Sequence, residues 1–208
     1  MNQANRRAGQ TTRTLTELAL LTAVVLVMAS TPLGYLRVGP LTMSLLTVPV
    51  AIGAMLAGPE GGAWLGFVFG MTSFVNAVNG TGGLTAFAFQ ENPLACFLTC
   101  VATRVLCGLG CALLYRAAAR LLPGRPKLAC ALGALSAPVL NTLLFMSCLL
   151  GFFYGMEQIQ NLIDTFGVTN PLALAAAMVG LQGLVETVAC TAVATAVTVP
   201  LRKLLQRS

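Results

Sequence analysis

The sequence has few charged residues and contains no histidine. Only 9% of its 208 residues are charged, and its only lysines are Lys127 and Lys203. An ordinary soluble domain carries about 25% charged residues, so a soluble globule is excluded. Without histidine there is no histidine-ligated zinc site. No G-x-x-x-x-G-K-[ST] sequence is present, which excludes a P-loop and ATP hydrolysis by that route. We expect no catalytic group, metal or cofactor.

All seven cysteines lie inside apolar stretches rather than in loops. A disulfide framework is therefore not expected. Four of them, Cys96, Cys100, Cys107 and Cys111, fall on one stripe of a helix, because their spacing confines them to an arc of about 60° at 100° per residue. The stripe is too long for a single metal ion to use all four. The predicted role of these cysteines is packing.

Six apolar runs follow one another along the chain, and a membrane-spanning helix needs about 20 such residues. The runs cover about 15–30, 41–57, 62–78, 94–115, 128–153 and 172–200. The first run is interpreted as a membrane helix and not as a signal peptide. The predicted fold is an all-α, six-helix membrane bundle, a single integral membrane domain over 1–208, with 1–14 as a cytoplasmic tail.

The basic residues are distributed unevenly between the two sets of connections. With both termini in the cytoplasm, the inner segments hold ten of the twelve: Arg6, Arg7, Arg13, Arg116, Arg120, Arg125, Lys127, Arg202, Lys203 and Arg207. This asymmetry satisfies the positive-inside rule. The sequence thus predicts a multi-pass cell-membrane protein with cytoplasmic termini and no nucleic-acid partner. The outer connections 79–93 and 154–171 are long enough to form a lid or plain solvated loops.

Two charged residues lie deep in apolar runs, Arg104 in the fourth and Glu186 in the sixth. Inserting either one alone costs about 2.5 to 3.5 kcal/mol, so neither faces lipid. One interpretation is an ion pair that joins two helices. The other is that one or both line a polar cavity and contact a ligand. The two interpretations are compatible, and the sequence leaves both open.

Further polar side chains accompany these two charges. Gln182 lies one turn before Glu186 and shares its helix face, and Asn141 lies at depth in the fifth run. Asn76 and Asn92 flank the outer connection at 79–93. Together with Arg104 and Glu186, these residues predict a ligand pocket in the outward half of the last three helices.

Small residues at four-residue spacing let helices approach closely within lipid. The run Gly62, Gly66 and Gly70 is expected to serve internal packing. Ala19 and Ala23 lie near the cytoplasmic end of the first helix, where a partner membrane subunit can dock.

These polar residues favour one of three function classes. A substrate-binding membrane protein needs only a polar pocket under a lid. An intramembrane enzyme is poorly supported, because the acids at membrane depth reduce to Glu186, with Glu17 at an interface. A non-transporting scaffold or envelope assembly protein and an ion-coupled carrier remain as alternatives.

Several stretches, read together, resemble one family. They are Ala19-Leu-Leu-Thr-Ala23, Thr31-Pro-Leu-Gly-Tyr-Leu-Arg-Val-Gly-Pro40, Val48-Pro-Val-Ala-Ile-Gly-Ala-Met-Leu-Ala-Gly-Pro59, Gly66-Phe-Val-Phe-Gly70, and Asn92-Pro93 leading to Arg104. This order resembles the substrate-specificity subunit, or S component, of energy-coupling factor (ECF) vitamin transporters. The resemblance covers about 15–120 and then thins to the general helix plan, with Pro138-Val-Leu-Asn141 as its best later match.

The resemblance implies a protein that captures a vitamin outside the cell and delivers it inward with partners: a membrane coupling (T) subunit and two cytoplasmic ATPases. It maps the family's coupling surface to Ala19 and Ala23, and its vitamin pocket to the region of Arg104, Asn141, Gln182 and Glu186. Relatives often place proline directly before the arginine, where this chain has Thr103. An arginine at depth suits an anionic vitamin. Pantothenate is the leading expectation, with folate and riboflavin as alternatives.

Overall fold

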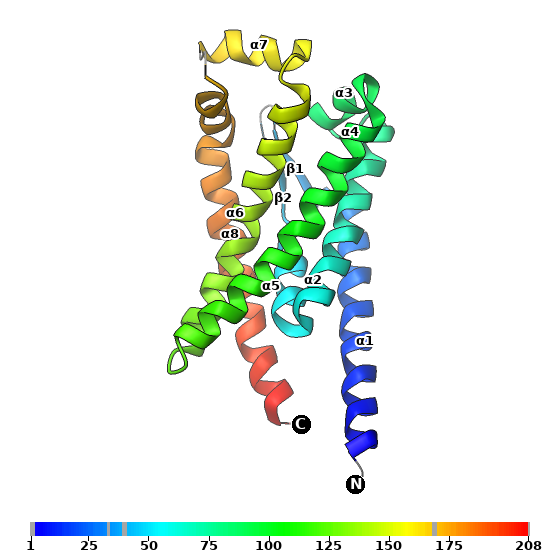
Figure 1. The fold of residues 1–208 in the computed structure, drawn as a ribbon, viewed down its shortest axis with the longest axis vertical. Helices are drawn as coiled ribbons and strands as arrows, with labels where there is room; N and C mark the ends of the chain where they lie inside the picture. Colours follow the sequence, from blue (N-terminus) through cyan, green and yellow to red (C-terminus); the bar gives the residue numbers. More distant parts are fainter. Residues whose placement is uncertain (1–2, 33, 39–40, 168–169, 208) are drawn as a thin grey trace.

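The computed structural model of the chain describes residues 3–32, 34–38, 41–167 and 170–207, which form an elongated helical bundle (Figure 1). A short antiparallel hairpin, β1 with β2, interrupts the helices. The elements in chain order are α1 (Gln3–Ala29), β1 (Tyr35–Val38), β2 (Leu41–Ser44), α2 (Thr47–Val78), α3 (Leu84–Glu91), α4 (Pro93–Phe97), the π-helical turn η1 (Leu98–Ala102), α5 (Thr103–Leu121), α6 (Pro126–Phe153), α7 (Glu157–Phe166) and α8 (Pro171–Arg207).

Within the described residues, five helical segments are long and apolar enough to cross a membrane: Thr12–Ala29, Thr47–Val78, Pro93–Leu121, Pro126–Phe153 and Gly183–Arg202. The chain is therefore a multi-pass membrane protein. The predicted count of six is not confirmed, because the expected helices 62–78 and most of 41–57 belong to one element, α2. The predicted tail 1–14 is also helical from Gln3 onward, as part of α1.

A break at Gly58 divides α2 into two halves. Gly58 has φ 78° and ψ −161°, a conformation that a side chain would strain. Pro59 follows, and it lacks the N–H that a continuous helix would use. A methyl group added to Gly53 would collide with the Leu65 side chain, although in a straight helix these two residues would lie about 18 Å apart. The halves therefore fold back against each other, as the separate predicted runs 41–57 and 62–78 require.

The start of the expected helix 41–57 was wrong. Leu41–Ser44 forms the strand β2, which pairs with β1 so that Tyr35 lies opposite Ser44, and the helix begins at Thr47. The apolar run at this point is short and β-compatible, and periodicity alone does not separate a buried strand from a helix start in such a run. The hairpin brings both Tyr35 and Ser44 to the interior of the bundle.

The glycine stripe of α2 packs against the backbone of η1 and α5. A methyl group on Gly62 would meet the carbonyl oxygen of Gly108, and one on Gly66 would meet that of Arg104. One on Gly70 would lie 2.7 Å from the Val101 Cα. The predicted packing role of this stripe is confirmed. The contact also fixes the position of Arg104 along the axis of the bundle.

Cysteines of the predicted stripe are buried between helices. The Cys107 thiol donates a hydrogen bond to the Ala137 carbonyl at 3.2 Å, and Cys111 donates to the Gly133 carbonyl at 3.2 Å, so both tie α5 to α6. Cys96 and Cys100 are also fully buried, toward the other end of the span.

The helix α1 lies at the periphery. Only 6% of its span Thr12–Ala29 is buried, against 44% of the α2 span and 50% of Pro93–Leu121. Its buried contact is Val25, which packs with Leu46 and Phe69. The Trp64 indole N–H on α2 donates a hydrogen bond to the Thr22 hydroxyl at 3.1 Å. Ala19 and Ala23 are exposed on this helix.

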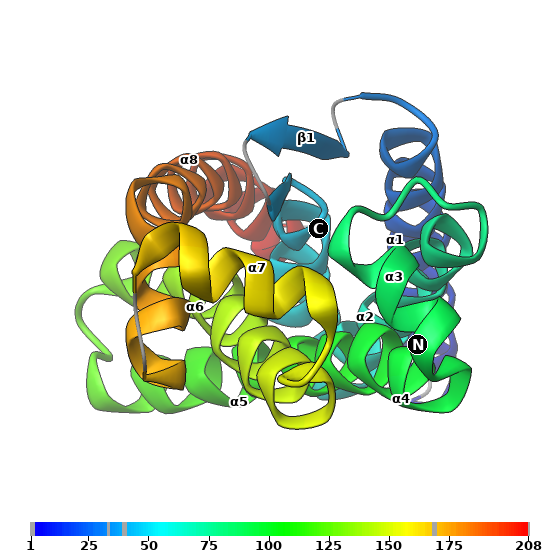
Figure 2. The ribbon, with the colours of Figure 1, turned by 90° about the horizontal axis from the view of Figure 1, so that it is seen from above.

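The two ends of the bundle differ in construction. The short helices α3, α4 and α7 lie at one end, and α1 begins and α8 ends at the other, where the α5–α6 connection also lies (Figure 1). Seen from above, α7 runs across the ends of α6 and α8 (Figure 2). The basic segments thus gather at one end of the molecule. Which side of the membrane that end faces stays a prediction.

Candidate ligand-binding site

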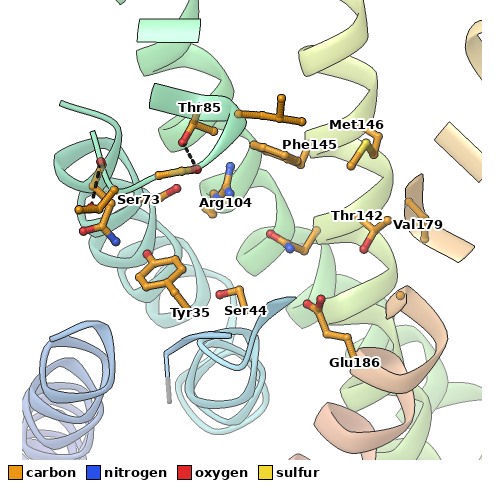
Figure 3. A pocket seen from close by; sticks show the side chains of 16 residues that line it. Tyr35, Ser44, Ser73, Thr85, Arg104, Thr142, Phe145, Met146, Val179 and Glu186 are labelled. Atoms are coloured by element: carbon orange, nitrogen blue, oxygen red, sulfur yellow. Dashed lines mark hydrogen bonds between the residues drawn. The ribbon is translucent and has the colours of Figure 1, made fainter. Parts of the chain in front are cut away.

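A pocket opens among α2, α3, α5, α6, α8 and the hairpin, in the half of the bundle that carries α3 and α4 (Figure 3). Together with the open space at its mouth it has a volume of about 850 Å³. Its lining residues are Tyr35, Ser44, Ser73, Asn76, Thr81, Gly82, Leu84, Thr85, Arg104, Asn141, Thr142, Phe145, Met146, Val179, Gly183 and Glu186. Ten of these sixteen residues are polar, which suits a polar ligand better than a lipid chain.

Arg104 is held in the pocket wall by the turn that precedes it. Its Nη1 donates hydrogen bonds to the Thr99 carbonyl at 2.9 Å and to the Thr103 hydroxyl at 3.2 Å. The guanidinium carbon lies 4.4 Å from the centre of the Phe145 ring and 5.2 Å from that of Phe69. Such contacts favour a cation over an aromatic face. Arg104 is therefore fixed in direction although no carboxylate pairs with it in the described part of the chain.

Glu186 reaches the pocket from α8 and is 7% exposed. Its carboxylate lies close to the backbone amide of Ser44. Glu186 and Arg104 lie on different walls (Figure 3), and the one ion pair found among the described residues is Arg13–Glu17 at 3.2 Å. A helix-joining Arg104–Glu186 bridge, one of the two sequence-based interpretations, is absent from this arrangement.

Four buried polar atoms of the lining have no hydrogen-bond partner within the part of the chain that the structure describes. They are Ser44 Oγ, Arg104 Nε, Asn141 Oδ1 and Glu186 Oε1. Buried polar atoms are satisfied in the great majority of cases, and each exception calls for a reason. Because all four line one pocket, a polar guest with donors and acceptors along its length would satisfy them together.

The other predicted site residues divide into three cases. Asn76 and Asn141 line the pocket beside Arg104 and Glu186. Asn92 does not line it. Its Oδ1 accepts hydrogen bonds from the backbone N–H groups of Leu94 and Ala95, at 3.1 Å each, so Asn92 caps α4. Gln182 belongs to α8, but its side chain lies outside the described residues.

Several lining residues were missed by sequence reasoning. Ser73 and Thr85 are single hydroxyls within apolar helices, and such residues often satisfy themselves on a backbone carbonyl, as Thr85 does with Gly82 at 2.9 Å. Tyr35 and Ser44 were missed because the hairpin was not predicted. The signal that was available is the polar alternation Thr42-Met43-Ser44 at the head of an apolar run.

Tyr35 closes one wall of the pocket. Its hydroxyl and that of Thr72 are 2.9 Å apart, and its ring centre is 6.4 Å from that of Phe69. Burial raises the pKa of Tyr35 above its usual value, despite the opposing effect of the Thr72 hydrogen bond. The phenol is therefore protonated at neutral pH and can offer its oxygen or its proton to a guest.

The expected lid is formed in part. The connection at 79–93 contains α3 and supplies Thr81, Leu84 and Thr85 to the pocket. The connection at 154–171 contains the amphipathic helix α7, whose Ile159 is fully buried against Leu149 and Phe153. No described residue of α7 lines the pocket. The first connection therefore borders the pocket and the second packs beside it.

Comparison with known proteins adds one finding. A comparison with individual curated proteins finds no match. The sequence profile of the family described as "ECF transporter, substrate-specific component" matches residues 13–198, nearly the whole chain.

Proposed function

The chain belongs to the family of ECF transporter substrate-specific components, and from this premise we propose that it captures a vitamin outside the cell for import. As a member, it is a substrate-binding transporter subunit and not an enzyme itself, and membership implies association with a membrane coupling subunit and ATPase modules. In our proposal the module contains one coupling (T) subunit and two cytoplasmic ATPases, and both termini of this chain are cytoplasmic.

The observation that carries the proposal is the pocket with its unpartnered polar atoms. Arg104 Nε and Glu186 Oε1 are buried in one cavity and face no partner of opposite charge among the described residues. A buried, unpaired charge is costly within a membrane protein, and such residues mark substrate or ion pathways. A bound vitamin that contacts both groups accounts for their presence in the bundle.

Pantothenate is the ligand that we propose first. Its carboxylate suits the guanidinium of Arg104, and its hydroxyl groups, at the other end of the molecule, can donate to the Glu186 carboxylate and the Asn141 amide oxygen. A planar guanidinium can hold a carboxylate with two parallel hydrogen bonds. Folate also carries carboxylates, and riboflavin offers hydroxyls without one. Both are therefore natural competitors to test.

Coupling to the partners is assigned in this proposal to Ala19 and Ala23 on α1. Both are exposed, they lie one turn apart on one face, and the helix that carries them is scarcely buried by the rest of the chain. Small residues let another membrane helix approach closely. This face is the surface on which we expect the coupling subunit to dock.

The test begins with the purified chain in detergent. Native mass spectrometry identifies any small molecule that stays bound, and isothermal titration then measures binding of pantothenate, folate and riboflavin. We expect pantothenate to bind and Arg104→Gln to weaken its binding by about a hundredfold, while Leu143→Ala, a change at an exposed apolar position of α6, leaves the affinity unchanged. Absence of binding for all three compounds, with a well-folded protein, would refute the assignment to these vitamins.

A further inference from the structure

The helix that carries Arg104 changes its winding directly before that residue. Leu98–Ala102 forms a π-helical turn between α4 and α5. Such turns are rare and widen the backbone spiral, and they occur frequently at functional sites. Here the Thr99 carbonyl accepts a hydrogen bond from the Thr103 hydroxyl at 2.5 Å and another from Arg104 Nη1 at 2.9 Å. The irregular turn therefore supplies a backbone acceptor to the pocket arginine.

The Thr103 side chain completes this arrangement. Its oxygen accepts a second hydrogen bond from Arg104 Nη1 at 3.2 Å, while its own proton goes to the Thr99 carbonyl. Both hydrogen bonds described for the guanidinium thus leave from Nη1. Nε, on the other side of the group, has no partner among the described residues. Nη1 of the guanidinium is therefore held by hydrogen bonds, and the Nε–Nη2 edge can bind another molecule.

Packing restricts the guanidinium further. It lies over the rings of Phe145 from α6 and Phe69 from α2. Behind it, the close approach of Gly66 to the Arg104 carbonyl leaves the backbone no room to shift toward α2. Rotation of the group about the Nε–Cζ bond would break the two Nη1 hydrogen bonds. The edge formed by Nε and Nη2 is therefore presented in one orientation.

We propose that Thr103 is a positioning residue that clamps Nη1 of Arg104, so that the Nε–Nη2 edge receives a planar carboxylate of the substrate side-on. The inference rests on the proposed function for the presence of a substrate, but the clamp itself is a property of the ligand-free protein. It identifies the substrate class by its chemistry: a small molecule with a carboxylate at the end that enters beside α5. Lysine at position 104 cannot replace the Nε–Nη2 edge of arginine, because its ammonium group does not present two parallel N–H donors in one plane.

The clamp is tested first without any ligand. Protein labelled with ¹³C,¹⁵N-arginine is observed by NMR in detergent micelles, and the Arg104 signals are identified by their loss in Arg104→Lys. We expect separate Nη1 and Nη2 signals in the wild type, because rotation about Nε–Cζ is hindered. In Thr103→Val, which has nearly the same shape but no hydroxyl, the two signals are expected to merge.

Two further variants make the comparison specific. Thr103→Ser keeps the hydroxyl and should restore separate signals. Thr198→Val is the matched control, because the hydroxyl of the buried Thr198 on α8 has no partner among the described residues and Thr198 lies outside both the clamp and the pocket lining. Its spectrum should equal that of the wild type. Separate signals that persist in Thr103→Val, with an unchanged melting temperature, would overturn the clamp.

Measurement of pantothenate binding is the second part of this test. Thr103→Val should weaken binding by about tenfold or more, as the loss of a hydrogen bond to a charged group predicts, whereas Thr103→Ser and Thr198→Val should stay within about twofold of the wild type. If the wild type binds no pantothenate but its Arg104 signals are separate, the proposed ligand is wrong and the clamp stands. Merged signals in Thr103→Val with undiminished affinity would refute side-on recognition while leaving the proposed function intact.

Discussion

Arg104 differs from an ordinary buried arginine in what it contacts. Its described neighbours are a carbonyl, a hydroxyl and two aromatic rings, and Glu186 lies on another wall of the pocket. These neighbours hold the cation without neutralising it. The same holds for Glu186, which forms no ion pair among the described residues and whose Oε1 has no hydrogen-bond partner there. Both charges are therefore available to a guest, and single substitutions should act on binding more than on folding.

Two substitutions of Arg104 distinguish the effect of its positive charge on binding from the effect of its two-donor edge. Arg104→Lys keeps the positive charge but loses the two-pronged donor edge, and we expect pantothenate binding to weaken by about tenfold or more. Arg104→Gln loses the charge too and should weaken it by about a hundredfold, since hydrogen bonds to charged groups contribute about 1.5–3 kcal/mol each. Isothermal titration measures both. Equal affinity in the lysine variant and the wild type would contradict a carboxylate held side-on.

Asn92 should behave differently from Asn76, although both were predicted as site residues. Asn92→Ala removes the cap of α4 and should lower the free energy of unfolding by about 1 kcal/mol, with ligand affinity unchanged. Asn76→Ala removes a pocket side chain and should weaken binding instead. Denaturation and titration of the two variants provide the comparison. A loss of affinity in Asn92→Ala without loss of stability would show that Asn92 contacts the ligand.

These residues also show what sequence reasoning can reach. Arg104 and Glu186 were recognisable because a charge within an apolar run has few structural uses, and the structure places both in one pocket. The hydroxyl groups of Ser73 and Thr85 carry no such signal, because a hydroxyl in a membrane helix usually bonds to its own backbone. The role of Thr103 depends on a π-helical turn, and no residue pattern in 93–103 predicts that turn.

At the scale of elements, the apolar runs located most helices well, and the errors fall where the backbone departs from regular helix. The run 128–153 corresponds to α6, Pro126–Phe153, with a boundary difference of two residues. The run 41–57 begins as a strand, because β2 pairs with β1. Backbone that is not helical is tolerated at membrane depth only where protein or a polar cavity satisfies it. That condition depends on tertiary contacts, which a hydropathy profile does not contain.

The contact between α2 and α5 is set by glycines and can be tested at one of them. Gly66→Ala would bring a methyl group onto the Arg104 carbonyl, and we expect a loss of about 1–3 kcal/mol in the free energy of unfolding. Gly151→Ala is the matched control, because it lies within α6 with no atom close to the added methyl group, and alanine is the better helix former. Chemical denaturation in detergent measures both. Equal stability of Gly66→Ala and the wild type would show that the helices can move apart freely.

At the scale of the whole molecule, the bundle has a tightly packed part and a loosely attached helix. The spans of α2, Pro93–Leu121 and α6 bury 44 to 50% of their residues, whereas the span of α1 buries 6%. In a membrane protein, a helix face without protein contacts meets either lipid or another subunit. The family to which the chain belongs works with a membrane coupling subunit, and the exposed face of α1 is the surface on which we propose that it docks.

Docking at α1 should be separable from ligand binding. Ala19→Phe and Ala23→Phe each place a large side chain on the small-residue face, and we expect uptake of labelled vitamin by cells to fall to background while the purified variants keep wild-type affinity. Val24→Phe is the control, because Val24 is also exposed but points about 100° or more away from both alanines around the helix. Normal uptake by the two alanine variants would refute this docking face.

The hydrogen bond between Trp64 and Thr22 gives the chain an intrinsic optical reporter. Trp64 is the sole tryptophan, it is half exposed on the bundle surface, and its partner Thr22 sits between Ala19 and Ala23 along α1. The emission spectrum of the protein thus originates at the seam where we expect the coupling subunit to arrive, away from the cavity. Reconstitution with that subunit should shift the emission maximum, and titration with vitamin alone should leave it in place. An unlabelled sample in a fluorimeter can in this way distinguish assembly of the importer from capture of its cargo.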